Sequence, residues 1–202
     1  ASPSANSITK FNSQALNVIM GTAKDAFNLD QENDKIKEVY GDTSIGKQLL
    51  LARRLCEFGT RFVTINYGGW DMHSNIANAL KGRVPPLDKA LAAFVDDVHQ
   101  RGLNEKILLI VTGEFGRTKL NKNAGRDHWP SISTMLMSGG RYDSGRVIGK
   151  ADKSYTPKET PYGPIDVAAT MFDHFGISKN IQRVDTGGCP RYLLEGEGQL
   201  ML

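Results

Sequence analysis

Apolar residues along the chain recur in two patterns, and each pattern predicts a different kind of element. Where they return every three or four positions, they predict helices that are buried on one face. Where they form short continuous or alternating runs, they predict strands. The predicted helices cover residues 45–56, 85–101 and 164–172, and the predicted strands cover residues 61–67, 107–112, 133–138 and 146–150.

Capping residues support the ends of these helices. Residues 42–44, Asp-Thr-Ser, offer an N-cap for the first helix, and Gly59 suits the left-handed position after its end. Pro85 and Pro86 favour the first turn of the second helix, because proline lacks the N–H group that stays unused there. Gly102 is expected to end that helix.

Strands alternate with helices, which predicts an α/β fold with a parallel or mostly parallel sheet covered on both faces. The run 107–112, Ile-Leu-Leu-Ile-Val-Thr, is expected to be a strand buried on both faces. Residues 1–41 are polar with sparse apolar positions and predict a helical N-terminal arm, so the main domain is expected to cover residues 42–202. That domain starts with a helix and no preceding strand, and the chain has no initiator methionine or signal peptide. We therefore expect it to be truncated at its N-terminus.

Composition narrows the functional classes. Of 202 residues, 40% are apolar and 23% charged, which is ordinary for a globular domain with a sizeable core. A net charge of +3 with scattered basic residues argues against nucleic-acid binding. No apolar stretch is long enough to be a transmembrane segment. Cys56 and Cys189 lack metal-ligand spacing; Cys56 suits a buried free thiol, and their pairing stays open.

Polar side chains gather just after the two predicted central strands. Asp71 and His73 follow the first strand, and Glu114 and Arg117 follow the second. Chemistry in open α/β sheets is found beyond the carboxyl ends of strands. In the next loop come Arg126, Asp127 and His128.

Carboxylates and imidazoles in this arrangement predict a site for a divalent metal, Zn, Mn, Mg or Ca. Such a metal could polarise a phosphoryl or sulfuryl oxygen, or lower the pKa of a bound water. The guanidinium groups of Arg117 and Arg126 match a tetrahedral anion.

Each of these residues also has a purely structural interpretation. Asp71 and His73 could cap the next helix, Glu114 could pair with Arg117, and His128 could pack beside Trp129. Taken together at two strand ends, they favour a site. The chain has no Gly-x-Ser-x-Gly elbow and no phosphate-binding Gly-x-x-x-x-Gly-Lys loop, and no serine or threonine stands out as a nucleophile.

Three blocks carry a resemblance to a known family: residues 69–73 (Gly-Trp-Asp-Met-His), 113–118 (Gly-Glu-Phe-Gly-Arg-Thr) and 125–130 (Gly-Arg-Asp-His-Trp-Pro). They resemble the signature of the domain of unknown function 1501 family, which is abundant in planctomycetes and related bacteria. That family is similar to sulfatases and to the alkaline phosphatase superfamily. The resemblance implies a three-layer α/β/α sandwich with a two-metal site. It also implies export to the periplasm or cell envelope, and a nucleophile in an N-terminal half that this chain lacks.

The family's ligand pattern carries over in part. Asp71 and His73 resemble the Asp–His pair for one metal, but with one intervening residue instead of three. Glu114 stands where the superfamily has the Asp of a second pair, and the next residue, Phe115, cannot bind metal. His128 resembles the last ligand histidine, and Asp127 beside it is a further candidate.

The resemblance therefore implies metal-dependent hydrolysis of sulfate or phosphate esters by the full-length form. In this role Glu114, Arg117 and Arg126 are catalytic candidates. Small anionic esters or sulfated or phosphorylated glycans are the implied substrates, and the isolated chain is expected to be inactive. The alternative is a non-catalytic binding protein of the cell envelope that keeps the fold.

Overall fold

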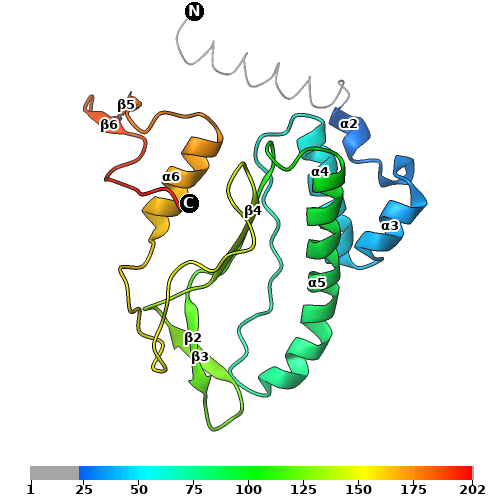
Figure 1. Ribbon diagram of the computed structural model, residues 1–202, viewed down its shortest axis with the longest axis horizontal. Helices are drawn as coiled ribbons and strands as arrows, with labels where there is room; N and C mark the ends of the chain where they lie inside the picture. Colours follow the sequence, from blue (N-terminus) through cyan, green and yellow to red (C-terminus); the bar gives the residue numbers. More distant parts are fainter. Residues whose placement is uncertain (1–22, 202) are drawn as a thin grey trace, which may run out of the picture. The chain divides into compact units, whose positions relative to one another are not determined.

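The computed structural model describes residues 23–201 of the chain (Figure 1). The chain divides into two compact units, Ala1–Leu103 and Asn104–Leu202. In the described residues the first unit is helical, whereas the second holds the strands and one helix. None of the helices in this part of the chain is both long and apolar enough to cross a membrane.

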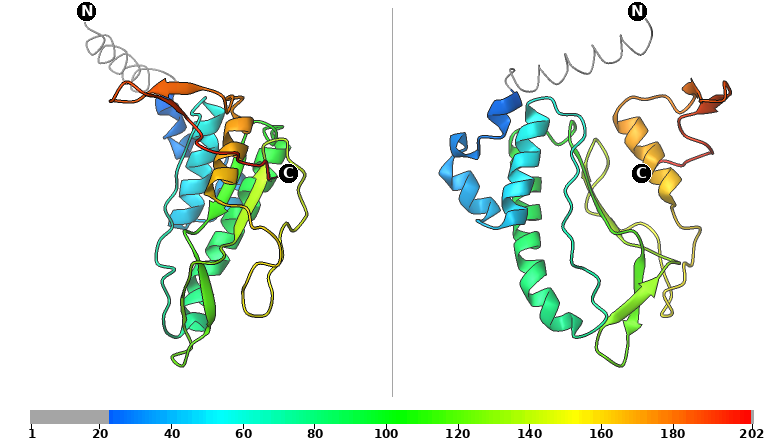
Figure 2. Two further views of the ribbon diagram at one scale, coloured as in Figure 1. Left: turned by 90° about the vertical axis from the view of Figure 1, so that its left-hand side faces the viewer. Right: turned by 180° about the vertical axis from the view of Figure 1, so that it is seen from behind.

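The first unit is built on two helices, α4 (Ser44–Glu57) and α5 (Ile76–Gln100), which lie side by side (Figure 2). Residues 1–22 of the predicted N-terminal arm lie outside the described part of the chain. From there the chain forms three short elements before α4, which are α2 (Ala23–Ala26), η1 (Leu29–Gln31) and α3 (Asp34–Tyr40).

Helix α4 confirms the helix predicted over residues 45–56. The Thr43 hydroxyl accepts a hydrogen bond from the Gly46 N–H at 3.2 Å, which makes Thr43 the N-cap residue. Gly59 follows the helix with a φ of +94°, as the left-handed end position requires. Ile45, Leu49 and Ala52 of the predicted apolar face are buried and form the core of this unit with Phe94 and Val98 of α5. Leu55 and Cys56, which were predicted on the same face, are half-buried.

The start of α5 differs from the prediction. The helix begins at Ile76, so Pro85 and Pro86 lie inside it instead of at its first turn. Each proline removes one backbone hydrogen bond and crowds the carbonyl four residues earlier, which bends a helix without necessarily ending it. The first half of α5 curves away from the axis of the second half (Figure 2).

The buried face of α5 also differs from the predicted one. Helical spacing predicts Val95 in the core together with Leu87, Leu91, Phe94 and Val98. In the structure Val95 is 36% exposed, whereas Asp97 is only 6% exposed. A carboxylate is stable in that position because cations neutralise it there. Arg53 lies with its Nε 2.8 Å from Asp97 Oδ2, and Arg101 donates from Nε to Asp97 Oδ1 at 2.6 Å.

Arg53 is the centre of a buried ion cluster that joins α3, α4 and α5. Its side chain is 1% exposed and donates hydrogen bonds to Glu32 and Glu57. Its Nε contact with Asp97 is an ion pair and not a directed hydrogen bond. Tyr40 donates its hydroxyl to the same Asp97 carboxylate at 3.0 Å, and burial is the main reason that the pKa of Tyr40 is raised.

Arg54, the next residue, fastens the segment before α3 to α4. Its Nε donates to the Ala26 carbonyl at 3.0 Å, and one terminal nitrogen donates to the Asp25 carbonyl at 2.7 Å. The other terminal nitrogen lies 3.1 Å from the Glu32 carboxylate. Two adjacent arginines of α4 thus hold the short elements in place through charge-assisted hydrogen bonds.

Residues 61–67 were predicted as a strand, but the structure shows no strand hydrogen bonding there. The segment nevertheless keeps the strand period, because Val63, Ile65 and Tyr67 are half-buried while their polar neighbours are exposed. A strand needs a partner for its N–H and C=O groups, and alternation of apolar residues supplies none. The sequence pattern was therefore sufficient for the extended course but not for the pairing.

The second unit contains three two-stranded sheets. Strand β1 (Leu108–Thr112) pairs with β4 (Met135–Gly139), and β2 (Gly116–Leu120) pairs with β3 (Arg126–Trp129). Strands β5 (Gln182–Val184) and β6 (Pro190–Tyr192) form the third sheet. The predicted strands 107–112 and 133–138 are thereby confirmed as β1 and β4 within two residues.

The mostly parallel sheet that was predicted is not found among the described residues, where every sheet is antiparallel. A parallel pair needs a long crossover, usually a helix. Between β1 and β4 the chain instead forms the β2–β3 hairpin, so that β4 returns antiparallel to β1, with Leu108 opposite Gly139. Leu108 to Val111 of β1 are half-buried and not fully enclosed. The structure therefore mixes helices and strands without displaying a three-layer parallel sandwich.

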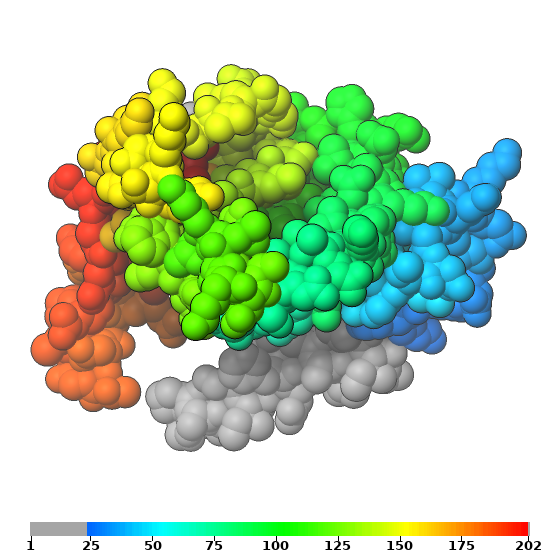
Figure 3. All heavy atoms as spheres, turned by 90° about the horizontal axis from the view of Figure 1, so that it is seen from below, coloured from blue at the N-terminus to red at the C-terminus, as the bar shows by residue number. Residues whose placement is uncertain are grey.

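Residues 146–150 were predicted as an edge strand, but they are irregular and lie in an exposed loop that covers 143–151 (Figure 3). Gly145 and Gly149 have φ values of +78° and +81°, which interrupt an extended course on both sides of the apolar pair Val147-Ile148. At the end of this loop, Ala151 forms a single antiparallel bridge with Pro157.

Helix α6 (Pro164–His174) confirms the last predicted helix. Asp166 caps its start by accepting the Gly163 N–H and also accepts the Gln199 N–H at 2.7 Å from the C-terminal segment. The Tyr142 hydroxyl donates to Asp173 and to the Thr170 carbonyl, and burial together with the Asp173 carboxylate raises its pKa to about 12. These contacts fasten α6 to the chain on both sides of it.

His174, in the last turn of α6, is expected to make the second unit less stable below neutral pH. Burial is the main cause that lowers its pKa, and the Arg141 charge acts in the same direction. The backbone of Lys106 and Gly140 and the Asp173 carboxylate act in the opposite direction. Because the folded state favours the neutral imidazole, the full stability is present above an unfolded-state pKa of about 6.5 and is lost as the pH falls below it.

The measurement is the free energy of unfolding by urea at several pH values between neutral and mildly acidic. His174→Gln should flatten the decline, whereas His99→Gln, at an exposed position of α5, should keep it. An equal decline in wild type and His174→Gln would contradict the assignment.

Both cysteines are free thiols. Cys56 is half-buried on α4, and burial raises its pKa; Cys189 is exposed just before β6. Cys56 therefore matches the prediction of a free thiol, although part of its side chain remains accessible.

Candidate metal site

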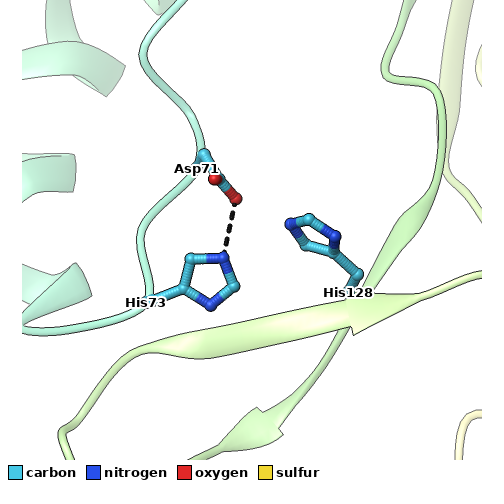
Figure 4. Close-up of side chains that lie close together, drawn as sticks. All are labelled: Asp71, His73 and His128. Carbon is cyan, nitrogen blue, oxygen red and sulfur yellow. Dashed lines mark ion pairs between the residues drawn. The ribbon is translucent and has the colours of Figure 1, made fainter.

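Asp71 and His73 lie on the loop that leads from residues 61–67 into α5. The His73 Nε2 is 3.0 Å from the Asp71 Oδ1, and both side chains are about half exposed, at 46% and 62% (Figure 4). The two side chains therefore point toward one another from the same turn. The structure thus brings the first predicted pair of candidate ligands together in space.

The loop is held by contacts on either side of the pair. The Trp70 indole N–H donates to the Tyr67 carbonyl, and the two rings meet edge to face with centroids 5.6 Å apart. The Met72 N–H donates to the Trp70 carbonyl at 3.0 Å, and the Met72 side chain is 8% exposed. Asp71 thus lies between an aromatic anchor and a buried apolar anchor.

His128 is placed by the β2–β3 hairpin of the second unit, and Figure 4 labels it on β3. It lies opposite Arg117 in the strand register. The Phe115 ring packs against the imidazole with centroids 4.4 Å apart, and the Arg117 guanidinium lies 5.5 Å from the centroid of the same ring. Arg117, Phe115 and His128 therefore form an aromatic stack with a cation on one side.

The turn of this hairpin fixes the place of His128 on β3 relative to β2. The Asn121 side-chain oxygen accepts the N–H groups of Asn123 and Gly125, both at 3.0 Å. Ala124 adopts a φ of +54°, which completes the tight turn. An Asx-type turn of this kind fixes the local backbone and hence the register of the two strands.

Asp127 and His128 project from opposite faces of β3, as adjacent residues of a strand do. The Asp127 carboxylate accepts a hydrogen bond from the Asn121 side chain at 3.1 Å, and the Asp127 backbone N–H donates to the Thr118 hydroxyl. The structure therefore separates the side chains of Asp127 and His128, which the sequence alone could not do.

The remaining candidates lie close to the same hairpin. Arg126 shares its face of β3 with His128, since the two residues are two positions apart. Its carbonyl accepts a hydrogen bond from Arg117 at 3.4 Å. Glu114 lies in the exposed bend between β1 and β2. The hairpin thus carries two half-buried arginines and one exposed imidazole, and guanidinium groups are suited to binding an anion.

Sequence reasoning missed two features of the site. It treated Phe115 only as a residue that cannot bind metal, whereas the ring orients both Arg117 and His128. Phe115 lies one residue before β2, so strand periodicity did not indicate this role. It also missed Arg83 of α5, whose guanidinium donates to the Gly68 carbonyl at 2.7 Å. No local sequence pattern indicates that contact.

The model of a family described as "Protein of unknown function (DUF1501)" matches residues 2–201. No curated protein and no solved structure matches the chain.

Proposed function

Because the chain belongs to the DUF1501 family of proteins of unknown function, we propose that it binds a divalent metal ion through Asp71, His73 and His128. In its full-length form it would use this metal to hydrolyse sulfate or phosphate esters. The observation that carries the proposal is the exposed Asp71–His73 pair on a braced loop. An enclosing three-layer sandwich and export to the cell envelope belong to the same proposal, and both rest on the sequence resemblance.

The donor set fits such an ion. One carboxylate and two imidazoles, all exposed, suit Zn better than Mg or Ca, which favour oxygen ligands. Two ligand atoms around a tetrahedral zinc ion with bonds of about 2 Å lie roughly 3.3 Å apart. The 3.0 Å between Asp71 Oδ1 and His73 Nε2 is close to that spacing. This pair could therefore hold one cation with little movement of its loop.

The substrate class follows from the hairpin. Arg117 and Arg126 would bind the anionic group, and Glu114 would be a further ligand or a base. A guanidinium group holds a sulfuryl or phosphoryl oxygen through paired hydrogen bonds, and its charge stabilises the transition state. The bound metal would supply Lewis acidity at the same group.

The first test is metal binding by the purified chain. After metal-free dialysis, we expect about one equivalent of Zn or Mn to bind. Loss of an outer-shell partner typically lowers metal affinity about 10- to 100-fold, so His73→Ala and His128→Ala should each lower it at least about 10-fold. Calorimetric titration and elemental analysis measure both quantities. His99→Ala is the matched control, because His99 is an exposed histidine of α5.

Binding of no metal by the wild-type chain would count against the proposal. So would equal binding by wild type and both ligand variants. If His73→Ala abolished binding but His128→Ala did not, the site would be confined to the first unit. The ligand set proposed above would then be wrong.

A second candidate function is a non-catalytic binding protein that keeps one structural metal. Phe115 favours it, since an aromatic ring stacked on His128 occupies the position after Glu114 where a second-metal ligand is expected. Cobalt substitution discriminates between the two. A spectrum that changes on adding sulfate or phosphate indicates an open coordination position, as catalytic sites have, whereas an unchanged spectrum indicates a closed structural site. Turnover of nitrophenyl sulfate or phosphate by the full-length protein would then decide for the hydrolase.

A further inference from the structure

Arg83 of α5 lies against the glycine pair that precedes the Asp71–His73 loop. Its Nη1 donates to the Gly68 carbonyl at 2.7 Å. A Cβ atom on Gly69 would overlap the guanidinium group, and Gly69 has a φ of +85° that side-chain-bearing residues rarely adopt. The absence of a side chain at this glycine is therefore what lets the guanidinium lie on the backbone.

We propose that Arg83 is a positioning residue for the Asp71–His73 pair, fixing the turn from which both side chains project. The inference rests on the proposed function in one respect, since the pair is taken to be the metal-binding pair. The contact that carries it lies wholly within the first unit.

In the contact between loop and helix, Arg83 both donates and accepts a hydrogen bond. Arg83 donates from its side chain to the Gly68 carbonyl, and its own carbonyl accepts the Tyr67 hydroxyl at 3.4 Å. Two hydrogen bonds between adjacent loop residues and one helix residue restrict both translation and rotation of the loop. A lysine at position 83 could keep the charge, but it would lack the planar guanidinium group with its fixed set of donors.

Few residues separate the contact of Arg83 from the Asp71–His73 pair. Gly69 is followed by Trp70, whose indole N–H is bonded to the Tyr67 carbonyl, and then by Asp71. On the far side, Met72 is buried. Asp71 is therefore held between Arg83 on one side and the Met72 side chain on the other. Ordering both ligands before the ion arrives removes part of the entropy cost of binding it.

The experiment compares Arg83→Met with Arg83→Lys and with Lys81→Met, a control at an exposed position of the same helix. Metal affinity should fall about 10-fold or more in Arg83→Met, the range measured for residues that orient metal ligands. It should fall less in Arg83→Lys and stay unchanged in Lys81→Met. Circular dichroism before each titration shows that the helices are intact.

A metal-independent readout separates this inference from the proposed function. The ring resonances of His73 in the metal-free protein report its contact with Asp71. In Arg83→Met they should move to the position that they have in Asp71→Asn. If they stay at the wild-type position, the inference is wrong whatever the metal affinity. If the wild type binds no metal but the resonances move as expected, only the proposed function is wrong.

A substitution on the other side of the contact provides a check that leaves Arg83 in place. Gly69→Ala should displace the guanidinium and reproduce the shift of the His73 resonances, whereas Gly82→Ala meets no atom within 4 Å and should not. Combined with Arg83→Met, Gly69→Ala should add less than it does alone, because the group it displaces is already gone. Full additivity would contradict a shared mechanism.

Discussion

Replacing Arg53 by methionine is expected to lower the free energy of unfolding of the first unit by about 3–5 kcal/mol, the usual cost of removing one partner from a buried ion pair. Methionine fills most of the volume but leaves the Asp97 carboxylate, which is 6% exposed, without its nearest cation on α4. Arg101 still binds Asp97 at 2.6 Å and offsets part of the loss. We therefore expect a value near the lower end of the range.

Urea denaturation followed by circular dichroism measures this change. Arg61→Met is the matched control, because Arg61 is exposed in the same unit and its replacement should change stability by less than about 0.5 kcal/mol. Asp97→Asn together with Arg53→Met should be less destabilising than the sum of the two single changes, since the group at position 97 that loses Arg53 is then no longer charged. A loss of less than about 1 kcal/mol in Arg53→Met would mean that the cluster is solvated in solution.

Gly139→Ala is expected to destabilise the second unit by about 2–5 kcal/mol, from two sources that add. Gly139 has a φ of +81°, and the left-handed conformation costs an alanine about 1–2 kcal/mol. A Cβ atom there would also overlap the carbonyl oxygens of Asn104 and Ile107, and such overpacking costs about 1–3 kcal/mol. Those oxygens already accept the Gly140 N–H, so moving them disrupts the end of β4.

Gly145→Ala separates the two sources. Gly145 has a similar φ of +78°, but a Cβ atom there meets nothing within 4 Å. It should therefore show the conformational cost alone, about 1–2 kcal/mol at most. Equal losses in the two variants, measured by urea denaturation, would show that the overlap at Gly139 is relieved without cost.

Much of the helical structure could be predicted from local patterns. Helices α4 and α6 begin and end close to the predicted residues because their caps, Thr43 and Gly163 with Asp166, act within three or four positions. The start of α5 could not be predicted this way. Pro85 and Pro86 are ordinarily first-turn residues, whereas α5 begins at Ile76 and continues through both of them.

Strand pairing was predicted poorly for a physical reason. Periodicity shows which residues face the same side, but the partner of a strand is chosen by chain segments far away in sequence. Residues 107–112 were therefore placed correctly as a strand, while the antiparallel pairing of β1 with β4 was not expected. The extended segment 61–67 shows the same limit, since its alternation is present and its pairing is not.

The candidate site was predicted in residue type more than in geometry. Asp71 and His73 were singled out because they follow the predicted strand 61–67, and the structure brings them together at 3.0 Å. The separation of Asp127 from His128 depends on the face of β3, which requires the strand to be known first. Arg83 and Phe115 act through a helix-to-loop contact and a cross-strand stack. A single sequence encodes neither as a motif.

The chain has two tryptophans, and the fold assigns one to each unit. Trp70 donates its indole N–H to the Tyr67 carbonyl in the first unit, and Trp129 donates to the Tyr155 carbonyl in the second. Intrinsic fluorescence therefore contains one tryptophan emission from each unit. Trp129→Phe leaves an emission that reports the first unit alone, next to Asp71, and Trp70→Phe leaves one that reports the second. The order in which the two units lose structure is thus accessible without any added label.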